Sequence, residues 1–364
     1  MGGFHANQIS STFLDYAATD CLSIAVALTN QRLKSSTSLA KASRPRECTY
    51  ILYGTSCADA ANSRQAAALT VIIGHHSRLQ APIVSRIKVL PQYLLPKQGL
   101  TRFAGRIAGA KGGAQTTTLI RWFVKQYGVN MDEALNPDIA SYSSFNEFFT
   151  RPLRDGVRPL ASADFVCPVD GAISQFGDIK DHQIFQAKGH SFSTTALVGG
   201  DAALAQQYQH GSFANLYLSP KDYHRLHMPC DGRLTRMIYV PGALFSVNPT
   251  TARGIPNLFA RNERVVCVFE SPEFGQFVSV LVGATIVGSM ATTWHGVVNP
   301  PRSAELREWR YDDQDIVIKK GAEMGRFLLG STIVMLFKKD TIKFNPDWAP
   351  ERSVRLGEMM GAKP

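Results

Sequence analysis

The sequence predicts an α+β protein, in which amphipathic N-terminal helices precede a mainly antiparallel β body. Three observations lead to this prediction. The 364 residues are 45% hydrophobic and 10% aromatic, which is typical of a packed globular protein. Two segments between residues 89 and 160 repeat apolar residues at helical spacing. From Phe165 onward, short strand-like runs alternate with turns rich in Pro, Gly, Asn and Asp.

Residues 1–88 differ from the rest of the chain, and we expect them to be a leader without a fold of its own. They are rich in Ser, Ala and Thr, and they carry a net charge of +5 out of the total of +10. A transit peptide has this composition, whereas a secretory signal would begin with basic residues and a myristoylation signal would have Ser or Thr in place of Ala6. A misassigned start codon is the other explanation, and the sequence leaves both open.

Residues 89–160 are predicted to form amphipathic, basic helices. In the first helix, Leu100, Phe103 and Ile107 recur at spacings of three and four. A second apolar stripe lies within Leu119–Tyr127. Such stripes either pack on the body of the protein or lie on an anionic membrane surface. No apolar run reaches the roughly 20 residues that a spanning helix needs, so we expect no transmembrane segment.

Residues 161–364 are predicted to form the β-rich body. Six apolar runs bounded by turns are the expected strands: Phe213–Leu218, Arg233–Val240, Arg264–Phe269, Phe277–Val282, Asp315–Ile318 and Thr332–Phe337. The charge outside the leader forms no dense Lys/Arg block, so nucleic acid is not an expected partner. The six cysteines are scattered without a CxxC pair, which is typical of a reducing compartment.

Two histidines lie in the run from Ser219 to Cys230. Ser219 followed by Pro220 predicts a short helical turn, on which His224 and His227 would face the same way. Together with Cys230, they raise the question of a metal site. Zinc needs further ligands at regular spacing, and Pro229 would end the turn before Cys230, so no metal is expected. General acid–base roles are favoured over purely structural hydrogen bonds.

A Gly-Ser step at Gly330-Ser331 comes immediately before the last expected strand. Glycine has no Cβ to obstruct an attack on its carbonyl, so the Ser331 hydroxyl could attack the bond that precedes it. The step alone is weak evidence, because Gly211-Ser212 and Gly288-Ser289 are similar.

An acidic residue, Asp170, lies before a glycine turn and by itself would be assigned to that turn. With His227 and Ser331 it would complete a set of an orienting acid, a base and a nucleophile, in that order along the chain. The sequence alone does not show that the three side chains meet.

From about Val89 to near the carboxyl terminus, the chain resembles the bacterial, pyruvoyl-dependent phosphatidylserine decarboxylases (prokaryotic type I). The runs that carry the resemblance are Phe145–Phe149, Arg151–Asp155, Pro168–Gly171, Tyr217–Cys230, Leu244–Asn248, Phe259–Arg264, Val282–Ser289 and Glu323–Thr332. The Leu-Gly-Ser-Thr sequence around Ser331 is similar to the bacterial and mitochondrial cleavage motif. The leader is the departure from the bacterial pattern, and it leaves the localisation open.

The resemblance implies a self-cleaving enzyme that converts phosphatidylserine to phosphatidylethanolamine. Asp170 would orient His227, which would take the proton of Ser331, and the chain would break between Gly330 and Ser331. Ser331 would become a covalent pyruvoyl cofactor, which forms a Schiff base with the substrate amine so that carbon dioxide can leave. His224 would protonate the resulting carbanion, with His227 as the alternative. The two products, a β chain ending at residue 330 and an α chain of residues 331–364, would stay associated within a catalytic domain.

The lipid substrate also bears on partners and localisation. It favours contact of residues 89–160 with an anionic membrane surface. The expected location is peripheral, on the cytoplasmic face of the bacterial inner membrane, or on the mitochondrial inner membrane if residues 1–88 are a transit peptide. A homodimer is compatible with the sequence but is not indicated by it.

Two rival functions remain at this stage. A serine hydrolase would use the same three residue types, although no G-x-S-x-G elbow surrounds Ser331. A lipid-binding module would use these motifs only for structure. In both cases the polypeptide would remain uncut.

Overall fold

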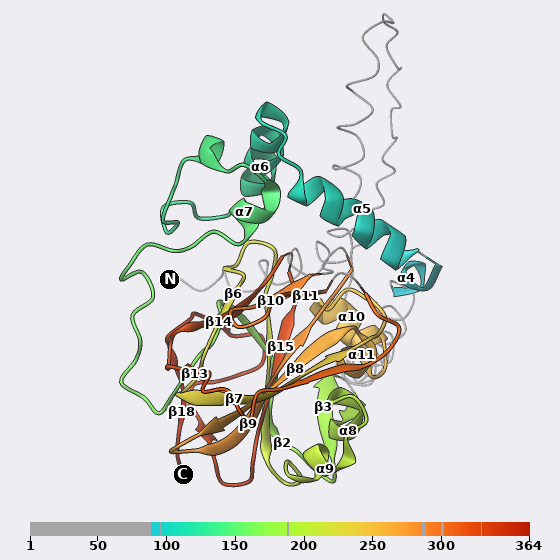
Figure 1. Ribbon diagram of the computed structural model, residues 1–364, viewed down its shortest axis with the longest axis vertical. Coiled ribbons are helices and arrows are strands. Elements are labelled where there is room, and N and C mark those ends of the chain that lie inside the picture. Colours follow the sequence, from blue (N-terminus) through green and yellow to red (C-terminus); the bar gives the residue numbers. More distant parts are fainter. Residues whose placement is uncertain (1–88, 95, 188, 286–288, 300–301, 329) are drawn as a thin grey trace, which may run out of the picture.

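The computed structural model describes residues 89–364, except 95, 188, 286–288, 300–301 and 329 (Figure 1). The leader predicted over residues 1–88 lies outside the described residues. The described part begins with helices α4 (Pro91–Leu94), α5 (Lys97–Gly109), α6 (Ala114–Tyr127), the 3-10 helix η1 (Ile139–Ser141) and α7 (Phe145–Phe149). Among the described residues, no helix is long and apolar enough to cross a membrane.

Local signals set the ends of α6 and α7. Helix α6 stops at Gly128, which adopts the left-handed conformation (φ +67°) that glycine accepts without steric cost. Helix α7 starts at Ser144, whose side chain accepts a hydrogen bond from the Glu147 N–H. The Glu147 carboxylate reaches back to the Ser143 N–H and hydroxyl, so both sides of the first turn are capped.

The two predicted amphipathic helices are both present, but their apolar stripes have different environments. On α6, Leu119 and Phe123 are buried, so this stripe packs on the body of the protein. On α5, the fully buried residues are Thr101, Ala104 and Ala108, whereas the predicted stripe of Leu100, Phe103 and Ile107 is only half-buried. The α5 stripe therefore keeps more apolar surface available for another partner than the α6 stripe does.

The body is a set of antiparallel sheets, which confirms the predicted α+β class. A nine-stranded sheet has the order β12-β7-β8-β9-β15-β5-β2-β17, with β13 also paired to β7. Its strands are β2 (Gly171–Asp178), β5 (Ser212–Tyr217), β7 (Gly232–Val240), β8 (Arg264–Ser271), β9 (Gly275–Val282), β12 (Arg307–Arg310), β13 (Val317–Ile318), β15 (Thr332–Phe337) and β17 (Ser353–Val354).

Smaller sheets and helices surround this sheet. A four-stranded sheet has the order β11-β10-β14-β6, a three-stranded sheet has the order β1-β18-β16, and β3 pairs with β4. Their strands are β1 (Phe165–Val166), β3 (Gln183–Ala187), β4 (His190–Ser193), β6 (Arg225–His227), β10 (Met290–Thr292), β11 (Gly296–Asn299), β14 (Glu323–Phe327), β16 (Lys343–Phe344) and β18 (Met359–Ala362). The remaining helices are α8 (Thr194–Leu197), α9 (Ala202–Gln206), α10 (Pro249–Gly254) and α11 (Leu258–Arg261).

Strand β15 lies in the interior of the nine-stranded sheet, between β9 and β5. Thr332 pairs with Tyr217 of β5 and with Val282 of β9, and this register continues to Phe337. All six residues of β15 are buried. The residue before this strand, Ser331, is therefore fixed by pairing on both sides.

Side chains of β15 alternate between two hydrophobic cores. Val334 and Leu336 belong to the first core, while Ile333, Met335 and Phe337 belong to the second. The first core also contains Phe123 of α6 and Phe148 of α7, so it joins the N-terminal helices to the sheet.

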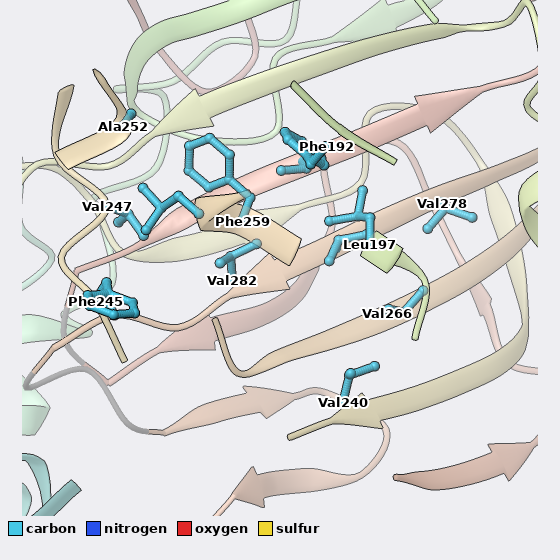
Figure 2. Close-up of a cluster of buried hydrophobic side chains, with 14 of the residues drawn as sticks. Phe192, Leu197, Val240, Phe245, Val247, Ala252, Phe259, Val266, Val278 and Val282 are labelled. Carbon is cyan, nitrogen blue, oxygen red and sulfur yellow. The ribbon is translucent and has the colours of Figure 1, made fainter. Parts of the chain in front are cut away.

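Figure 2 shows the part of the first core that lies under the short helices. Val240, Val266 and Val278 project from β7, β8 and β9 toward the layer that holds Leu197 and Phe259. Burial of each such side chain stabilises the fold by roughly 1.5–3 kcal/mol. This buried layer thus fixes the short helices α8 and α11 on the sheet.

Candidate active site

Ser331 is fully buried at the start of β15. Its carbonyl accepts a hydrogen bond from the Leu218 N–H at 2.9 Å, so the backbone of Ser331 is held against the end of β5. Its Oγ, in contrast, has no hydrogen-bond partner among the described residues. A buried hydroxyl without a partner costs roughly 1–3 kcal/mol, so a structural role alone does not explain this residue.

Gly330 lies against the imidazole of His224. A Cβ placed on Gly330 would be 3.2 Å from His224 Nε2, which is tighter than most side chains tolerate. Glycine thus lets the backbone of the Gly330-Ser331 step approach the ring. The imidazole Nε2 also lacks a hydrogen-bond partner among the described residues. Two unpartnered polar atoms therefore flank one peptide bond.

His224 is held in one tautomer and in an apolar setting. Its Nδ1 lies 2.7 Å from the Asp222 carbonyl, which can only accept, so Nδ1 carries the proton and Nε2 is a free acceptor. The ring centroid is 4.0 Å from that of Phe149, at the end of α7. Burial lowers the pKa of His224 to about 3, and the charge of Arg151 acts in the same direction. His224 is therefore neutral at neutral pH.

His227, at the end of β6, uses both ring nitrogens. Its Nδ1 is 2.9 Å from the Gly321 carbonyl, and its Nε2 is 3.2 Å from the Tyr223 hydroxyl. Burial lowers the pKa of His227, while hydrogen bonding to Gly321 and the nearby acid Glu323 oppose this shift. If the hydrogen bond to the Tyr223 hydroxyl breaks, His227 Nε2 can accept a proton from another group.

Asp170 is bound by a different set of groups. Its carboxylate accepts hydrogen bonds from Arg158 Nε at 2.9 Å, from Arg158 Nη2 at 2.6 Å and from the Leu356 N–H at 2.9 Å. Among the hydrogen bonds of the described residues, none joins Asp170 to His227. The two segments are adjacent, however, because the His227 N–H donates to the Pro168 carbonyl at 2.9 Å.

Comparison with known proteins identifies the family of the chain. A family model described as phosphatidylserine decarboxylase matches residues 145–362, and a second, described as PSD, matches residues 87–128. The chain belongs to the phosphatidylserine decarboxylase family. It is 74% identical over 277 residues to the phosphatidylserine decarboxylase proenzyme of Dechloromonas aromatica. The matched residues make up 76% of this chain and 98% of that protein. The corresponding proenzyme of Herminiimonas arsenicoxydans is 73% identical over 276 residues, covering 76% and 94% respectively.

The short helical turn predicted after Ser219 is wrong for this decarboxylase family member. Ser219–Asp222 forms a turn in which the Asp222 carboxylate accepts from both the N–H and the hydroxyl of Ser219. The chain then extends into β6, where His227 pairs with Glu323 of β14. Pairing with a distant strand overrides the local preference for a helix.

Other residues around the candidate site were not singled out from the sequence. Tyr223 and Arg151 lie within runs that carried the family resemblance, and this is the signal that could have identified them. Arg158 lies outside those runs, and no spacing rule connects it to Asp170. Within the part of the chain that the structure describes, no three His, Cys, Asp or Glu side chains are grouped as ligands for a metal ion.

The burial of His224 predicts a dependence of stability on pH. The folded pKa of about 3 lies below the unfolded value of 6.5, so the unfolded chain binds more protons between these limits and stability is lost as the pH falls through them. From about pH 7 to pH 5, this group should remove about 2 kcal/mol. Urea unfolding of an uncut Ser331→Ala chain should show this loss, and His224→Gln in that background should lack it. Equal losses in both chains would show that His224 does not titrate as described.

Proposed function

We propose that this protein is a phosphatidylserine decarboxylase that cuts itself between Gly330 and Ser331 and uses the resulting pyruvoyl group on residue 331. The observation that carries the proposal is the buried, unpartnered Ser331 Oγ, which follows a glycine in contact range of the His224 ring. The family membership supplies the reaction class. The arrangement supports a role for this particular bond.

The surroundings of residue 331 fit a small ketone group. The next residue, Thr332, has a buried hydroxyl without a partner among the described residues, and so has the side-chain amide of Asn215, which pairs with Val334 further along β15. Such groups are suited to binding oxygen atoms that are absent from the uncut chain. The pyruvoyl group would supply an electron sink that allows the substrate carboxyl to leave as carbon dioxide.

The maturation step uses groups of the chain itself and one water molecule. A base takes the proton of Ser331 Oγ, which attacks the Gly330 carbonyl carbon, and the peptide bond is replaced by an ester while the Ser331 amine is freed. Removal of the Ser331 α-proton then breaks the Cβ–Oγ bond and leaves a carboxylate on Gly330. The dehydroalanine that remains takes up water and releases ammonia to give the ketone.

We assign the base role to His227 and the orienting role to Asp170, as the family resemblance implies. In this assignment, His227 Nε2 has to leave the Tyr223 hydroxyl and turn toward Ser331, and Asp170 acts through its charge on the adjacent segment. His224 then serves the decarboxylation, where its free Nε2 beside residue 331 can pass a proton to the substrate carbon once it has taken one up.

The exchange of the two histidine roles is the second candidate assignment. It is favoured by one observation: His224 Nε2, and not His227, faces Gly330 in the structure and is free to accept the serine proton. Substitution of each histidine separates the two assignments.

The sheet order explains how the α chain, residues 331–364, would remain bound after the cut. It contributes β15 to the interior of the nine-stranded sheet, and it contributes β17 and β18, which pair with β2 and β1. Backbone hydrogen bonds from Ile173 to Arg352 and from Cys167 to Glu358 add to this docking. Residues 161–364 would thus remain one catalytic domain of two associated chains.

Residues 89–160 are proposed to contact the anionic membrane surface that carries the substrate. The half-buried stripe of α5 leaves Phe103 and Ile107 partly accessible, and Arg102 and Arg106 on the same helix are exposed. Each cation near an anionic surface contributes about 1 kcal/mol. This supports a peripheral location on the cytoplasmic face of a bacterial inner membrane, or on the mitochondrial inner membrane if residues 1–88 direct it there. A homodimer is compatible with this location.

The direct test is an assay with the full chain and phosphatidylserine in mixed micelles. Equal amounts of carbon dioxide and phosphatidylethanolamine are expected, and a hydrazine reagent that blocks ketones should stop the reaction. Absence of carbon dioxide release from protein that is fully cut would refute the proposed activity.

A further inference from the structure

Arg151 is a buried cation that has no direct ion pair within the described part of the chain. Arg151 comes two residues after the end of α7, and it is only 3% exposed. The guanidinium lies over the Phe148 ring at 5.2 Å, and Nη1 is 3.5 Å from the Phe148 carbonyl, which is at the limit for a hydrogen bond. Arg151 Nε has no hydrogen-bond partner among the residues that the structure describes. Within the described residues, no carboxylate forms an ion pair or a hydrogen bond with Arg151.

Arg158 and Arg264, in contrast, have direct partners for their guanidinium groups. Arg158 binds the carboxylates of Asp170 and Glu133, and these partners raise its pKa. Arg264, which is as buried as Arg151, donates to three backbone carbonyls. Burial lowers the pKa of Arg151, and the more distant charges of Asp170 and Glu133 oppose this shift only in part. Burying a cation without a direct ion pair is unfavourable, so the retention of Arg151 points to an anion that binds from outside the chain.

The position of Arg151 places that anion beside the proposed chemistry. Phe149, two residues earlier, contacts the ring of His224, and the Thr150 carbonyl accepts a hydrogen bond from Arg225 Nε at 2.9 Å. Residues 148–151 therefore run alongside residues 224–225. The charge of Arg151 also acts on the pKa of His224, which lies against Gly330.

We propose that Arg151 binds the phosphodiester of the substrate headgroup and so places the substrate amine at residue 331. This inference rests on the proposed function. The headgroup carries two anions, a carboxylate and a phosphodiester. A cation on the carboxylate would stabilise the charge that must be lost as carbon dioxide departs, whereas the phosphodiester keeps its charge throughout. The planar guanidinium also matches two phosphate oxygens at once.

The test compares Arg151→Met, Arg151→Lys and the control Arg154→Met, which removes an exposed arginine three residues away. Self-cleavage of each variant reports folding, and KM and kcat are measured with phosphatidylserine. Inhibition is measured with glycerophosphoethanolamine, which keeps the phosphodiester and lacks the carboxylate, and with ethanolamine and inorganic phosphate.

For Arg151→Met, we expect normal self-cleavage and a KM raised roughly ten- to a hundredfold. Inhibition by glycerophosphoethanolamine should weaken by the same factor, whereas inhibition by ethanolamine should not change. Arg151→Lys should be intermediate, and Arg154→Met should match the wild type. If Arg151→Met has a raised KM but is inhibited by glycerophosphoethanolamine as strongly as the wild type, Arg151 binds the carboxylate instead. This result would overturn the proposal. So would inorganic phosphate competing as well as glycerophosphoethanolamine, or both Arg151 variants remaining uncut. An inactive wild type would instead refute the enzyme activity itself.

Discussion

Ser331→Ala should leave the protein as one uncut chain of 364 residues without decarboxylase activity. The substitution removes the Oγ that attacks the Gly330 carbonyl, and it removes only an atom that makes no hydrogen bond with the described residues. The fold should therefore persist, because β15 keeps its pairing with β5 and β9. Denaturing gels and intact-mass measurement would detect the single species, and carbon dioxide release would be absent.

The matched control is Ser212→Ala. Ser212 also follows a glycine, Gly211, and it is also placed at a strand start, as the first residue of β5. This variant should be cut like the wild type, because Ser212 is only half-buried and its neighbour His210 is exposed, whereas Ser331 is fully buried beside the buried His224. Cleavage that persists in Ser331→Ala would place the scissile bond elsewhere, and loss of cleavage in Ser212→Ala would make strand integrity the requirement.

The second large effect is expected from the two histidines, which should separate maturation from decarboxylation. His227→Ala should remain uncut or be cut roughly a hundred- to ten-thousandfold more slowly, which is the usual contribution of a general base. His224→Ala should be cut, and its decarboxylation should fall by a similar factor. Cleavage is followed on denaturing gels over time, and decarboxylation is measured per cut molecule so that the two steps are not confused.

The opposite pattern would exchange the roles. A His224→Ala chain that stays uncut, with His227→Ala cut and poorly active, would show that the free Nε2 beside Gly330 is the base of maturation. Tyr223→Phe helps to interpret the result, since it frees His227 Nε2 from the tyrosine hydroxyl without removing a ring. If His227 is the base, this variant should still be cut.

The strands were predictable from the sequence because their side chains carry the signal. The run Thr332–Phe337 coincides with β15, and Arg264–Phe269 falls within β8, which extends two residues further to Ser271. Their order in the sheet was not predictable, because β15 pairs with β9 and β5 from distant parts of the chain. The local signal around Ser219 misled for a related reason: the pairing of β6 with β14 depends on residues about a hundred positions away.

The site was predictable in its residue types and less so in its contacts. The motif around Ser331 and the nearby histidines were identified through family resemblance, and the structure brings Gly330, Ser331 and His224 together. The ion pair of Asp170 with Arg158 follows from folding of the segment before β1, for which the sequence has no periodic signal. The burial of Arg151 likewise depends on how α7 packs, which no local pattern specifies.

The most direct test of the central claim is the intact mass of the purified wild-type protein, before and after a ketone-reactive hydrazine is added. We predict two species, one ending at Gly330 and a 34-residue chain of residues 331–364. The small chain should be lighter by one ammonia than a serine-terminated fragment, and it should gain a single hydrazine. A single full-length species in active protein, or a small chain that begins with an unmodified serine, would contradict the account.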